Sequence, residues 1–311
     1  MASEERKNIL VITLSNIGDV VLTTPVIASL RSAFPSARMT VVVGPKAAGL
    51  LQGSRSIERL LPYDKFGGFS RKLKLVRELR EGFYDYVVDL RNSALPYLVR
   101  AERRSPVFRR HTVKPARNRH LEVLRMMKLP VLEKGTFDFF SGKEELSLEQ
   151  KLRAKGVEFA QAWVAVAPGA GSEAKRWTVE GFCDVTARLL QIRPLTILVV
   201  GDEREVALGE RLGRVDPGRV INLCGEISLR ELAALLSRTR LLLTNDSACM
   251  HLAYELHRPV VALFGPTDPE KYGRQNEIWR LLAEPCLDTL SPEKVFRACE
   301  GLLNEASHAH P

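Results

Sequence analysis

The stretch that decides the fold is WVAVAPGAGSEAKRWTVEGFCDVTARLLQIRPLTILVV, residues 163–200. It opens with a short apolar run, Trp163–Ala167, and closes with another, Thr196–Val200. Between them, Val179–Gln191 repeats apolar residues at the spacing of one helical face. Uninterrupted apolar runs are typical of parallel strands that helices cover on both faces. The stretch therefore predicts a strand, a crossover helix and a second parallel strand.

The same alternation of strand and helix continues on both sides of this stretch. Residues 100–160 interrupt it, because prolines and glycines recur there and no apolar strand run is present. We therefore expect an α/β protein with two Rossmann-like domains, residues 1–155 and 156–311, each a doubly wound parallel sheet, facing a central cleft. The further predicted strands are Ile9–Leu14, Met39–Gly44, Tyr86–Leu90, Val220–Leu223, Leu241–Thr244 and Val260–Phe264, and the further predicted helices are Val20–Phe34, Leu229–Ser237 and Ala248–Leu256.

The composition excludes several classes of protein. Of the 311 residues, 45% are hydrophobic and 27% are charged, which is ordinary for a globular chain and excludes wholesale disorder. No apolar run reaches the roughly 20 residues that a membrane-spanning helix needs, and the N-terminal segment has no signal-peptide pattern. We therefore expect a cytoplasmic protein. The five cysteines form no CxxC pair, which argues against a disulfide scaffold and against a zinc ribbon.

The charge is divided unevenly along the chain. Residues 1–150 contain 26 Lys and Arg against 16 Asp and Glu, whereas residues 151–311 contain 20 against 21. Ten of the basic residues lie in Arg100–Lys128, and a further basic set lies in Lys65–Arg80. This asymmetry indicates an anionic partner for the first domain, which can be nucleic acid, a membrane surface or a phosphorylated ligand. Aromatic residues are sparse in the longer basic stretch, so stacking on nucleic-acid bases is poorly supported.

The segment NIGDVVLTTP, residues 16–25, follows the first strand. Gly18 would allow a tight turn there, and Asp19 would open the next helix. An aspartate at this position is commonly an N-cap, whereas at the mouth of a cleft it can act as a general base. Spacing alone favours the cap. The segment is not a dinucleotide-binding fingerprint, because GxGxxG is absent.

Two strand ends of the second domain carry residues suited to a nucleotide. In APGAGSEAKRW, residues 167–177, a loop with Gly and Ser precedes Lys175 and can present amides, a hydroxyl and an ammonium group to phosphate oxygens. The alternative is a plain loop with a solvated lysine, and spacing alone does not decide between them. In VVGDERE, residues 199–205, an acid after a strand can accept hydrogen bonds from ribose hydroxyls, although acids are also common at a helix start.

Two later segments add polar residues at strand ends. In TNDSACMHLAYEL, residues 244–256, Asp246 or Ser247 caps a helix whose first amides can bind phosphate. His251 shares a helical face with Ser247 and is either a packed residue or a phosphate contact. In the following PVVALFGPTDP, a strand ends in a Gly-Pro turn that carries Thr267.

Taken together and in this order, GDVVLTTP, PGAGSEAKRW and NDSACMHLAYELHRPVVALFGPTDP resemble glycosyltransferase family 9, the bacterial lipopolysaccharide heptosyltransferases. The resemblance covers nearly the whole chain. It implies a GT-B fold, in which the first domain binds the acceptor and the second binds the nucleotide-sugar donor. It further implies that ADP-heptose is the donor and that a phosphorylated lipopolysaccharide core is the acceptor. Transfer would invert the anomeric carbon without a metal or another cofactor.

The resemblance also implies roles for individual residues. Asp19 matches the aspartate proposed as the family's general base, and Lys175 matches the lysine at the donor diphosphate. Glu203 matches the acid that holds the donor ribose, with Glu205 as the alternative. The full set expected to bind the donor is Lys175, Ser172, Glu203, Asp246, Ser247, Ala248, His251 and Thr267. The set expected to bind the acceptor is Gly18, Arg91, Arg103, Arg104, Arg117 and Arg119.

Two departures from the family's pattern concern the donor. Some members have a Thr-Thr pair before the lysine where this chain has Ala170-Gly171, and others have Thr-Gly after the aspartate where it has Ser247-Ala248. Two other functions therefore stay open. One is a transferase of the same fold with another nucleotide-sugar and glycan, and the other is a non-catalytic protein that binds an anionic ligand or nucleic acid. For the family's function we expect a monomer in peripheral contact with the inner membrane, without nucleic acid as a partner.

Overall fold

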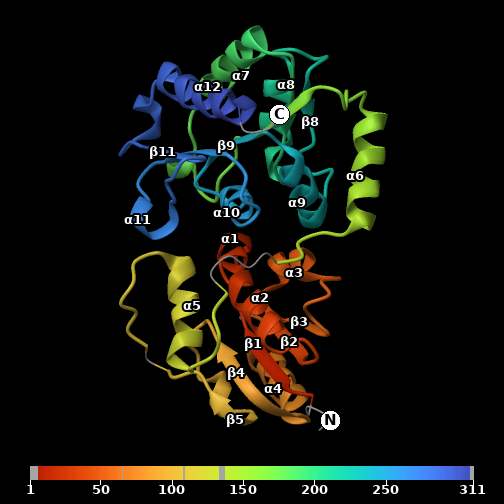
Figure 1. Cartoon of the computed structure of the whole chain (residues 1–311), viewed down its shortest axis with the longest axis vertical. Coiled ribbons are helices and arrows are strands. Elements are labelled where there is room, and N and C mark those ends of the chain that lie inside the picture. Colours follow the sequence, from red (N-terminus) through yellow and green to blue (C-terminus); the bar gives the residue numbers. More distant parts are fainter. Residues whose placement is uncertain (1–5, 65, 108, 133–136, 309–311) are drawn as a thin grey trace. The chain divides into compact units, whose positions relative to one another are not determined.

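The computed structural model describes residues 6–64, 66–107, 109–132 and 137–308. The chain divides into two compact units, and the boundary along the chain falls between Phe139 and Phe140. Each unit contains one sheet with helices on both of its faces (Figure 1). All strand pairs recorded in the two sheets are parallel, which confirms the predicted pair of doubly wound domains.

The first unit is built on a five-stranded sheet with the strand order β3-β2-β1-β4-β5. The chain runs from β1 outward to β3 and then returns to the other side of β1. This reversal makes the carboxyl ends of β1 and β4 the place where an open sheet of this kind binds ligands. The strands are β1 (Asn8–Ile12), β2 (Arg38–Val43), β3 (Arg59–Pro62), β4 (Phe83–Asp89) and β5 (Arg100–Arg104).

Helix α4 covers the face of the first sheet that α2 and α3 leave free. Leu75 and Leu79 of α4 are buried in a cluster with Leu10 and Ile12 of β1. Because crossovers between parallel strands are right-handed, the reversal of strand order puts α4 on the face opposite to α2 and α3. The helices are α1 (Ile17–Val21), α2 (Thr24–Ala33), α3 (Pro45–Leu51), α4 (Gly68–Arg80), the 3-10 turn η1 (Leu95–Tyr97) and α5 (Ala116–Met126).

The single helix predicted over Val20–Phe34 is two helices, α1 and α2. Pro25 occupies the first turn of α2, where its missing N–H costs no helical hydrogen bond. In the interior of one continuous helix the same proline would remove such a bond. The chain therefore ends α1 at Val21 and starts a second helix at Thr24.

The second unit is built on a six-stranded sheet with the strand order β11-β10-β9-β6-β7-β8. Its reversal lies between β6 and β9, so the loops after these two strands are the expected ligand site. The strands are β6 (Ala162–Ala167), β7 (Leu195–Val199), β8 (Val220–Asn222), β9 (Leu241–Asn245), β10 (Val260–Phe264) and β11 (Trp279–Ala283).

Helices cover both faces of the second sheet (Figure 1). The buried core on one face joins α7, α8 and α12 to alternate residues of the strands. On the other side, α9 contacts both α6 and α10. The helices and 3-10 turns are α6 (Gly142–Ala154), η2 (Glu173–Lys175), α7 (Val179–Ile192), η3 (Glu203–Glu205), α8 (Val206–Gly213), α9 (Leu229–Arg238), α10 (Ala248–Glu255), α11 (Pro269–Tyr272), η4 (Leu287–Thr289) and α12 (Pro292–His308).

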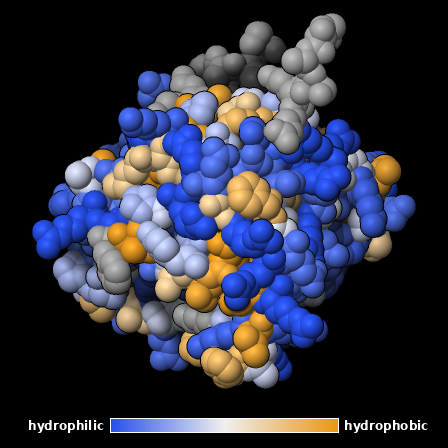
Figure 2. All heavy atoms as spheres, turned by 90° about the horizontal axis from the view of Figure 1, so that it is seen from below, coloured by the Kyte–Doolittle hydropathy of each residue, from blue (hydrophilic) through white to orange (hydrophobic). Residues whose placement is uncertain are grey.

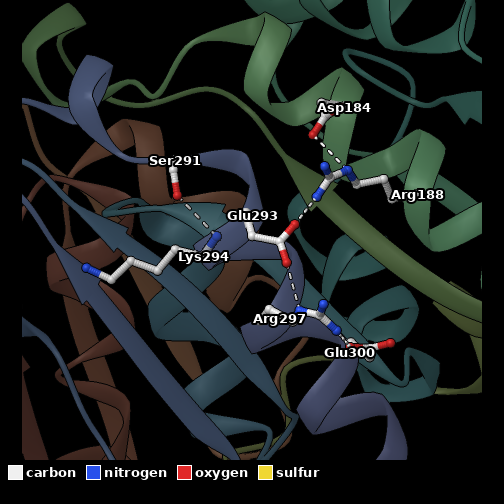
Figure 3. Close-up of polar contacts among 7 residues, drawn as sticks. All are labelled: Asp184, Arg188, Ser291, Glu293, Lys294, Arg297 and Glu300. Atoms are coloured by element: carbon white, nitrogen blue, oxygen red, sulfur yellow. Dashed lines mark hydrogen bonds and ion pairs between the residues drawn. The ribbon is translucent and has the colours of Figure 1, made fainter.

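The C-terminal helix α12 closes one face of the second core. Val295 and Cys299 are fully buried among apolar residues of α7 and the sheet. At the rim, Glu293 accepts hydrogen bonds from Arg188 of α7 at 2.5 Å and from Arg297 at 2.8 Å (Figure 3). Exposed ion pairs of this kind contribute little to stability, so the apolar contacts hold α12 in place.

Helix α6 belongs to the second unit. Its Ser147 and Lys151 side chains donate to Glu231 of α9, at 2.7 Å and 2.9 Å. The boundary between the units therefore lies before α6, and the boundary expected between 155 and 156 is wrong. The sequence pattern shows where strands stop and restart, but it does not show which sheet an intervening helix joins.

The sequence did not predict three strands, namely β3, β5 and β11, and each lies at an edge of its sheet. The expectation that residues 100–160 contain no strand is wrong for this reason, because β5 has the sequence RAERR. An edge strand pairs on one side only, and charged side chains there protect it from pairing with other chains. Such a strand lacks the apolar run by which buried strands are recognised.

Candidate active site

A buried amide side chain holds the loop that follows β6 in place by hydrogen bonds. Asn245, the last residue of β9, is fully buried. Its Nδ2 donates to the carbonyl oxygen of Pro168 at 2.8 Å, and its Oδ1 accepts from the backbone N–H of Trp177 at 3.0 Å. One side chain thus holds both ends of the segment 168–177 at the reversal point of the sheet. Sequence reasoning missed Asn245, because its partners lie far away along the chain.

Lys175 lies within this segment, at the end of η2. Its Nζ contacts Asp246 Oδ2 at 2.7 Å. The Asp246 side chain is 5% exposed and that of Lys175 is 33% exposed. The ammonium group therefore pairs with a buried carboxylate while part of the lysine side chain stays accessible to solvent. The structure thus brings together the two segments that hold Lys175 and Asp246. Asp246 fixes the ammonium group at the carboxyl ends of β6 and β9.

Helix α10 begins directly beside this pair. Its N-cap is Ser247 and not Asp246, which settles the alternative that the sequence left open. The Ser247 hydroxyl lies 3.0 Å from that of Thr244 and makes no side-chain cap, so Ala248 and the first amides of the helix lie next to an uncapped end. His251, one turn later, is buried, with its ring 6.0 Å from that of Tyr272.

Of the two candidate acids after β7, Glu205 borders the loop and Glu203 is exposed. A Cβ at Gly169 would lie 1.5 Å from Glu205 Oε1, and one at Gly201 would lie 2.5 Å from Oε2. Both glycines therefore make room for this carboxylate. Its Oε2 also accepts from the Asp202 N–H at 2.9 Å, while burial raises the pKa of the Glu205 carboxyl.

The remaining two donor candidates lie on either side of η2. Ser172 is exposed at its N-cap position. A Cβ at Gly265 would lie 2.7 Å from the carbonyl oxygen of Ala174, so the turn after β10 passes close against η2. Thr267, two residues further on, is half-buried in that turn. The structure thus brings the Thr267 turn to the Lys175 segment.

In the first unit, Asp19 is half-buried in the first turn of α1. The N-cap position is held by Asn16, whose side chain makes no cap, so the expectation that Asp19 is the N-cap is wrong. Asn16 Nδ2 instead donates to Asp19 Oδ2 at 3.0 Å. Gly18 lies inside α1. A close backbone approach is made by Gly44, where a Cβ would lie 2.4 Å from the Cα of Ser15.

Most of the arginines predicted to bind the acceptor hold the first unit together. The Nε of Arg104 donates to the Pro96 carbonyl at 2.9 Å, and the Nε of Arg119 donates to the Val113 carbonyl at 2.8 Å. Arg103 donates to the carbonyl of Met127 and lies over the Tyr86 ring. Arg117 is half-buried in α5, and Arg91 lies two residues beyond β4 with its guanidinium over the Tyr63 ring.

Asp89, at the end of β4, is a buried carboxylate that sequence reasoning missed. Its oxygens accept from the backbone N–H of Arg91 at 2.8 Å and from that of Ser93 at 2.6 Å. Arg109 donates to the Asp89 carbonyl at 2.6 Å. The available signal was the acid that closes the apolar run of β4, VVD.

Cationic groups surround His120 of α5. Burial, followed by the charges of His111, Arg109 and Arg119, lowers the pKa of His120 to about 4. The imidazole is therefore neutral at pH 7. An anion bound close to this group would be attracted by the neighbouring cations.

Two general features hold for the part of the chain that the structure describes. None of its helices combines the length and the apolar character that crossing a bilayer requires. Among the same residues, no three His, Cys, Asp or Glu side chains gather in the manner of a metal site.

Comparison with known proteins places this geometry in a family. Residues 72–298 match the model of glycosyltransferase family 9 (heptosyltransferase). A lipopolysaccharide core heptosyltransferase of Haemophilus influenzae is 24% identical over 296 residues, 89% of this chain and 84% of that protein. A solved family 9 glycosyltransferase of Veillonella parvula superposes with a TM-score of 0.83 and 23% identity, covering 96% of this chain and 97% of the other.

A second solved structure, the ADP-heptose lipopolysaccharide heptosyltransferase II of Escherichia coli, superposes with a TM-score of 0.79 and 21% identity. It covers 96% of this chain and 99% of the other. Both superpositions support the GT-B-like fold of two parallel sheets with flanking helices. The family match spans more than half of the sequence and includes Lys175 and Asp246. The chain therefore belongs to glycosyltransferase family 9 (heptosyltransferase) and is a glycosyltransferase.

Proposed function

We propose that this protein moves heptose from ADP-heptose to a phosphorylated core acceptor of lipopolysaccharide. The names of its relatives support the donor and the acceptor class. In this chain, the observation that carries the proposal is the Lys175–Asp246 pair at the reversal point of the second sheet. An ammonium group held there by a buried carboxylate suits the diphosphate of ADP.

The donor roles follow from the contacts around that pair. Lys175 and the first amides of α10 would stabilise the diphosphate as its bond to the anomeric carbon breaks. Asp246 is a positioning residue, because it acts through Lys175. For the ribose we propose Glu205 in place of Glu203, since its carboxylate lies against Gly169 of the same loop.

The proposed chemistry is a single in-line displacement. The acceptor hydroxyl oxygen attacks the anomeric carbon while the bond to the ADP oxygen breaks, and ADP leaves with the electron pair. The hydroxyl proton passes to the carboxylate of Asp19. One displacement inverts the anomeric carbon. Lys175 and the α10 amides supply the positive charge that the leaving diphosphate needs, so we propose that no metal takes part.

The acceptor side rests on the first unit. Its excess of basic residues suits a phosphorylated acceptor. Arg91 follows β4 by two residues and Arg109 donates to the Asp89 carbonyl, so both arginines lie at the end of β4, beside the reversal point of the sheet. We propose that the enzyme works as a monomer in the cytoplasm. Its substrate would be held at the inner face of the cytoplasmic membrane.

The experiment that tests the donor site is calorimetric titration with ADP, UDP and GDP, without added metal. We expect ADP to bind in preference, and Lys175→Ala to weaken it at least about tenfold, the usual range for a charge-assisted hydrogen bond. Lys294→Ala is the matched control, because that lysine also pairs with an acid of the second unit, at 2.9 Å. It should leave ADP affinity unchanged.

The double variant Lys175→Ala/Asp246→Asn separates two roles of the lysine. If Lys175 contacts the diphosphate, the double variant stays weak, because the ammonium group is still missing. If Lys175 only neutralises Asp246, removing both charges restores ADP affinity and the assignment is wrong. Preference for UDP or GDP would keep the fold and replace the donor.

A further inference from the structure

Helix α4 has apolar side chains on its outer side as well as on its packed side. Leu75 and Leu79 are buried against the first sheet. Phe69 and Leu73, however, are 79% and 57% exposed, and Phe66 in the preceding turn is 83% exposed. Single exposed apolar residues are normal on a protein surface, but three within eight residues form a patch that needs an explanation.

The patch follows the geometry of the helix. Phe69 and Leu73 are four residues apart and so adjoin on one side of α4. Tyr97 and Leu98, which are also exposed, belong to the segment whose Leu95 packs into the same cluster as the buried side of α4. Exposed apolar residues therefore also occur in a segment that packs against the same cluster as α4. Figure 2, which views the end of the molecule where α4 and β5 lie in Figure 1, shows apolar residues among hydrophilic ones.

Positive charge surrounds this apolar pair. Within the described residues, α4 has five basic residues and one acid, Glu78, which pairs with Arg59 of β3. Arg71 pairs with Asp64 at 3.7 Å. The other four cations of α4 are exposed and have no acidic partner in the part of the chain that the structure describes, and they are Lys72, Lys74, Arg77 and Arg80.

The spacing brings these cations close to the apolar side chains. Lys72 follows Phe69 by three residues and Arg77 follows Leu73 by four, so each cation lies beside one of the pair. The patch thus combines two large apolar groups with unpaired positive charge. This is the composition of helices that lie in the interface of an anionic membrane.

Charge and shape decide which partner fits. A second copy of the chain would bring like charges together, which disfavours self-association. A nucleic acid would take the cations but would leave Leu73 without a partner, since an aliphatic side chain offers no ring for a base to stack on. We propose that the α4 face binds an anionic phospholipid surface. Phe69 and Leu73 enter the boundary between headgroups and acyl chains, and the four unpaired cations contact headgroup phosphates.

This proposal deepens the peripheral membrane contact suggested by a lipid-linked acceptor, and its test does not use the transferase reaction. The full-length protein is sedimented with vesicles of phosphatidylglycerol and phosphatidylethanolamine, and separately with phosphatidylcholine vesicles. We expect binding to the anionic vesicles only. The variant Phe69→Ser/Leu73→Ser should weaken it at least about tenfold, because apolar burial contributes to interfacial binding.

Two matched controls are available in the second unit. Leu146→Ser removes a side chain of α6 that is 64% exposed, and it should leave binding unchanged. Lys72→Gln/Arg77→Gln should weaken binding by about fivefold for each charge removed. Lys143→Gln/Arg214→Gln removes the same net charge from exposed positions of the second unit and should have little effect.

A spectroscopic readout covers the case in which the double serine variant fails to fold. Phe69→Trp keeps an aromatic ring at the exposed position, and the three native tryptophans are buried. Its emission should shift to the blue and be quenched by brominated lipid when anionic vesicles are added, whereas that of Leu146→Trp should not. Equal binding to neutral vesicles, equal binding by Phe69→Ser/Leu73→Ser, or no shift for Phe69→Trp would overturn the proposal. Loss of ADP binding would not bear on it.

Discussion

The two units place polar residues at equivalent points but use them differently. Asp89 ends β4 and Asn245 ends β9, and each of these strands lies beside the first strand of its sheet, at the reversal of strand order. Both residues are fully buried. The side chain of Asp89 accepts from Arg91 and Ser93, in its own loop. That of Asn245 reaches the loop after β6, which lies far away along the chain.

The loops after the first strands of the two sheets differ in the same way. Asp19 of the first unit contacts Asn16, three residues earlier. Lys175 of the second unit pairs with Asp246 from another loop. The carboxylates of Asp19 and Asp89 in the first unit therefore accept hydrogen bonds from their own loops, whereas Lys175 and Asn245 in the second unit make contacts between loops. Substitutions in the first unit should change the chemistry with little loss of stability, whereas those in the second should change both.

The largest effect is expected for Asp19→Ala. Loss of one positioned general base commonly lowers a rate by about 10²–10⁴-fold. Because the contact of Asp19 with Asn16 is local and exposed, the melting temperature and ADP affinity should stay close to those of the wild type. The measurement is ADP release with ADP-heptose and a core acceptor, beside thermal unfolding.

Asn16→Ala serves as the control for Asp19→Ala. It removes the side chain that contacts Asp19 but leaves the carboxylate, so it should keep most of the activity. Turnover near the wild-type level in Asp19→Ala would exclude Asp19 as the base. A large drop in melting temperature would contradict the local character of its loop.

The second effect is expected for Asn245→Ala. It leaves the N–H of Trp177 and the carbonyl of Pro168 without their partner in a buried place, which costs about 1–3 kcal/mol. ADP affinity should fall as well, because the loop that carries Lys175 loses the two hydrogen bonds that hold it in place. Chemical denaturation and ADP titration measure the two results.

Thr186→Val is the matched control in the same unit. Thr186 is fully buried, and its hydroxyl has no hydrogen-bond partner among the described residues, so its loss should cost little. If Asn245→Ala is as stable as Thr186→Val, the loop is not held by this amide. The contrast between the two units would then fail.

The sequence predicted the parts of the fold that bury apolar surface on both sides. Apolar runs predicted the central strands at the positions where the structure has them, and these runs are Trp163–Ala167, Leu241–Thr244 and Val260–Phe264. The edge strand Arg100–Arg104 could not be found in this way, because a strand that pairs on one side tolerates charge. Pattern therefore predicts the centre of a sheet better than its edges.

For the site, the sequence located the loops but not the contacts between them. Lys175 and Asp246 were identified on their own segments, and the structure brings them together. Asn245 could not be predicted, because its partners, Pro168 and Trp177, lie far away along the chain. The proposal of Glu205 in place of Glu203 needed the position of Gly169, which the chain brings close only after folding. Contacts between distant loops are set by strand order and not by local spacing.

The smallest effect on activity is expected for Glu231→Gln, which tests contacts between elements away from the site. Burial alone would raise the pKa of Glu231, but hydrogen bonds from Lys151, the Ser228 amide and Ser147 outweigh it and lower the pKa from 4.5 to about 2. The unfolded chain therefore binds this proton at a higher pH than the folded one does. The stability that the carboxylate contributes is fully present above about pH 4.5 and is lost as the pH falls toward 2.

Melting temperatures between pH 6 and pH 2 should thus fall less steeply in Glu231→Gln than in the wild type. Glu145→Gln, at an exposed position of α6, should keep the wild-type slope. Equal slopes in all three proteins would mean that Glu231 does not clamp α6 to α9, and that the second unit relies on its apolar contacts there.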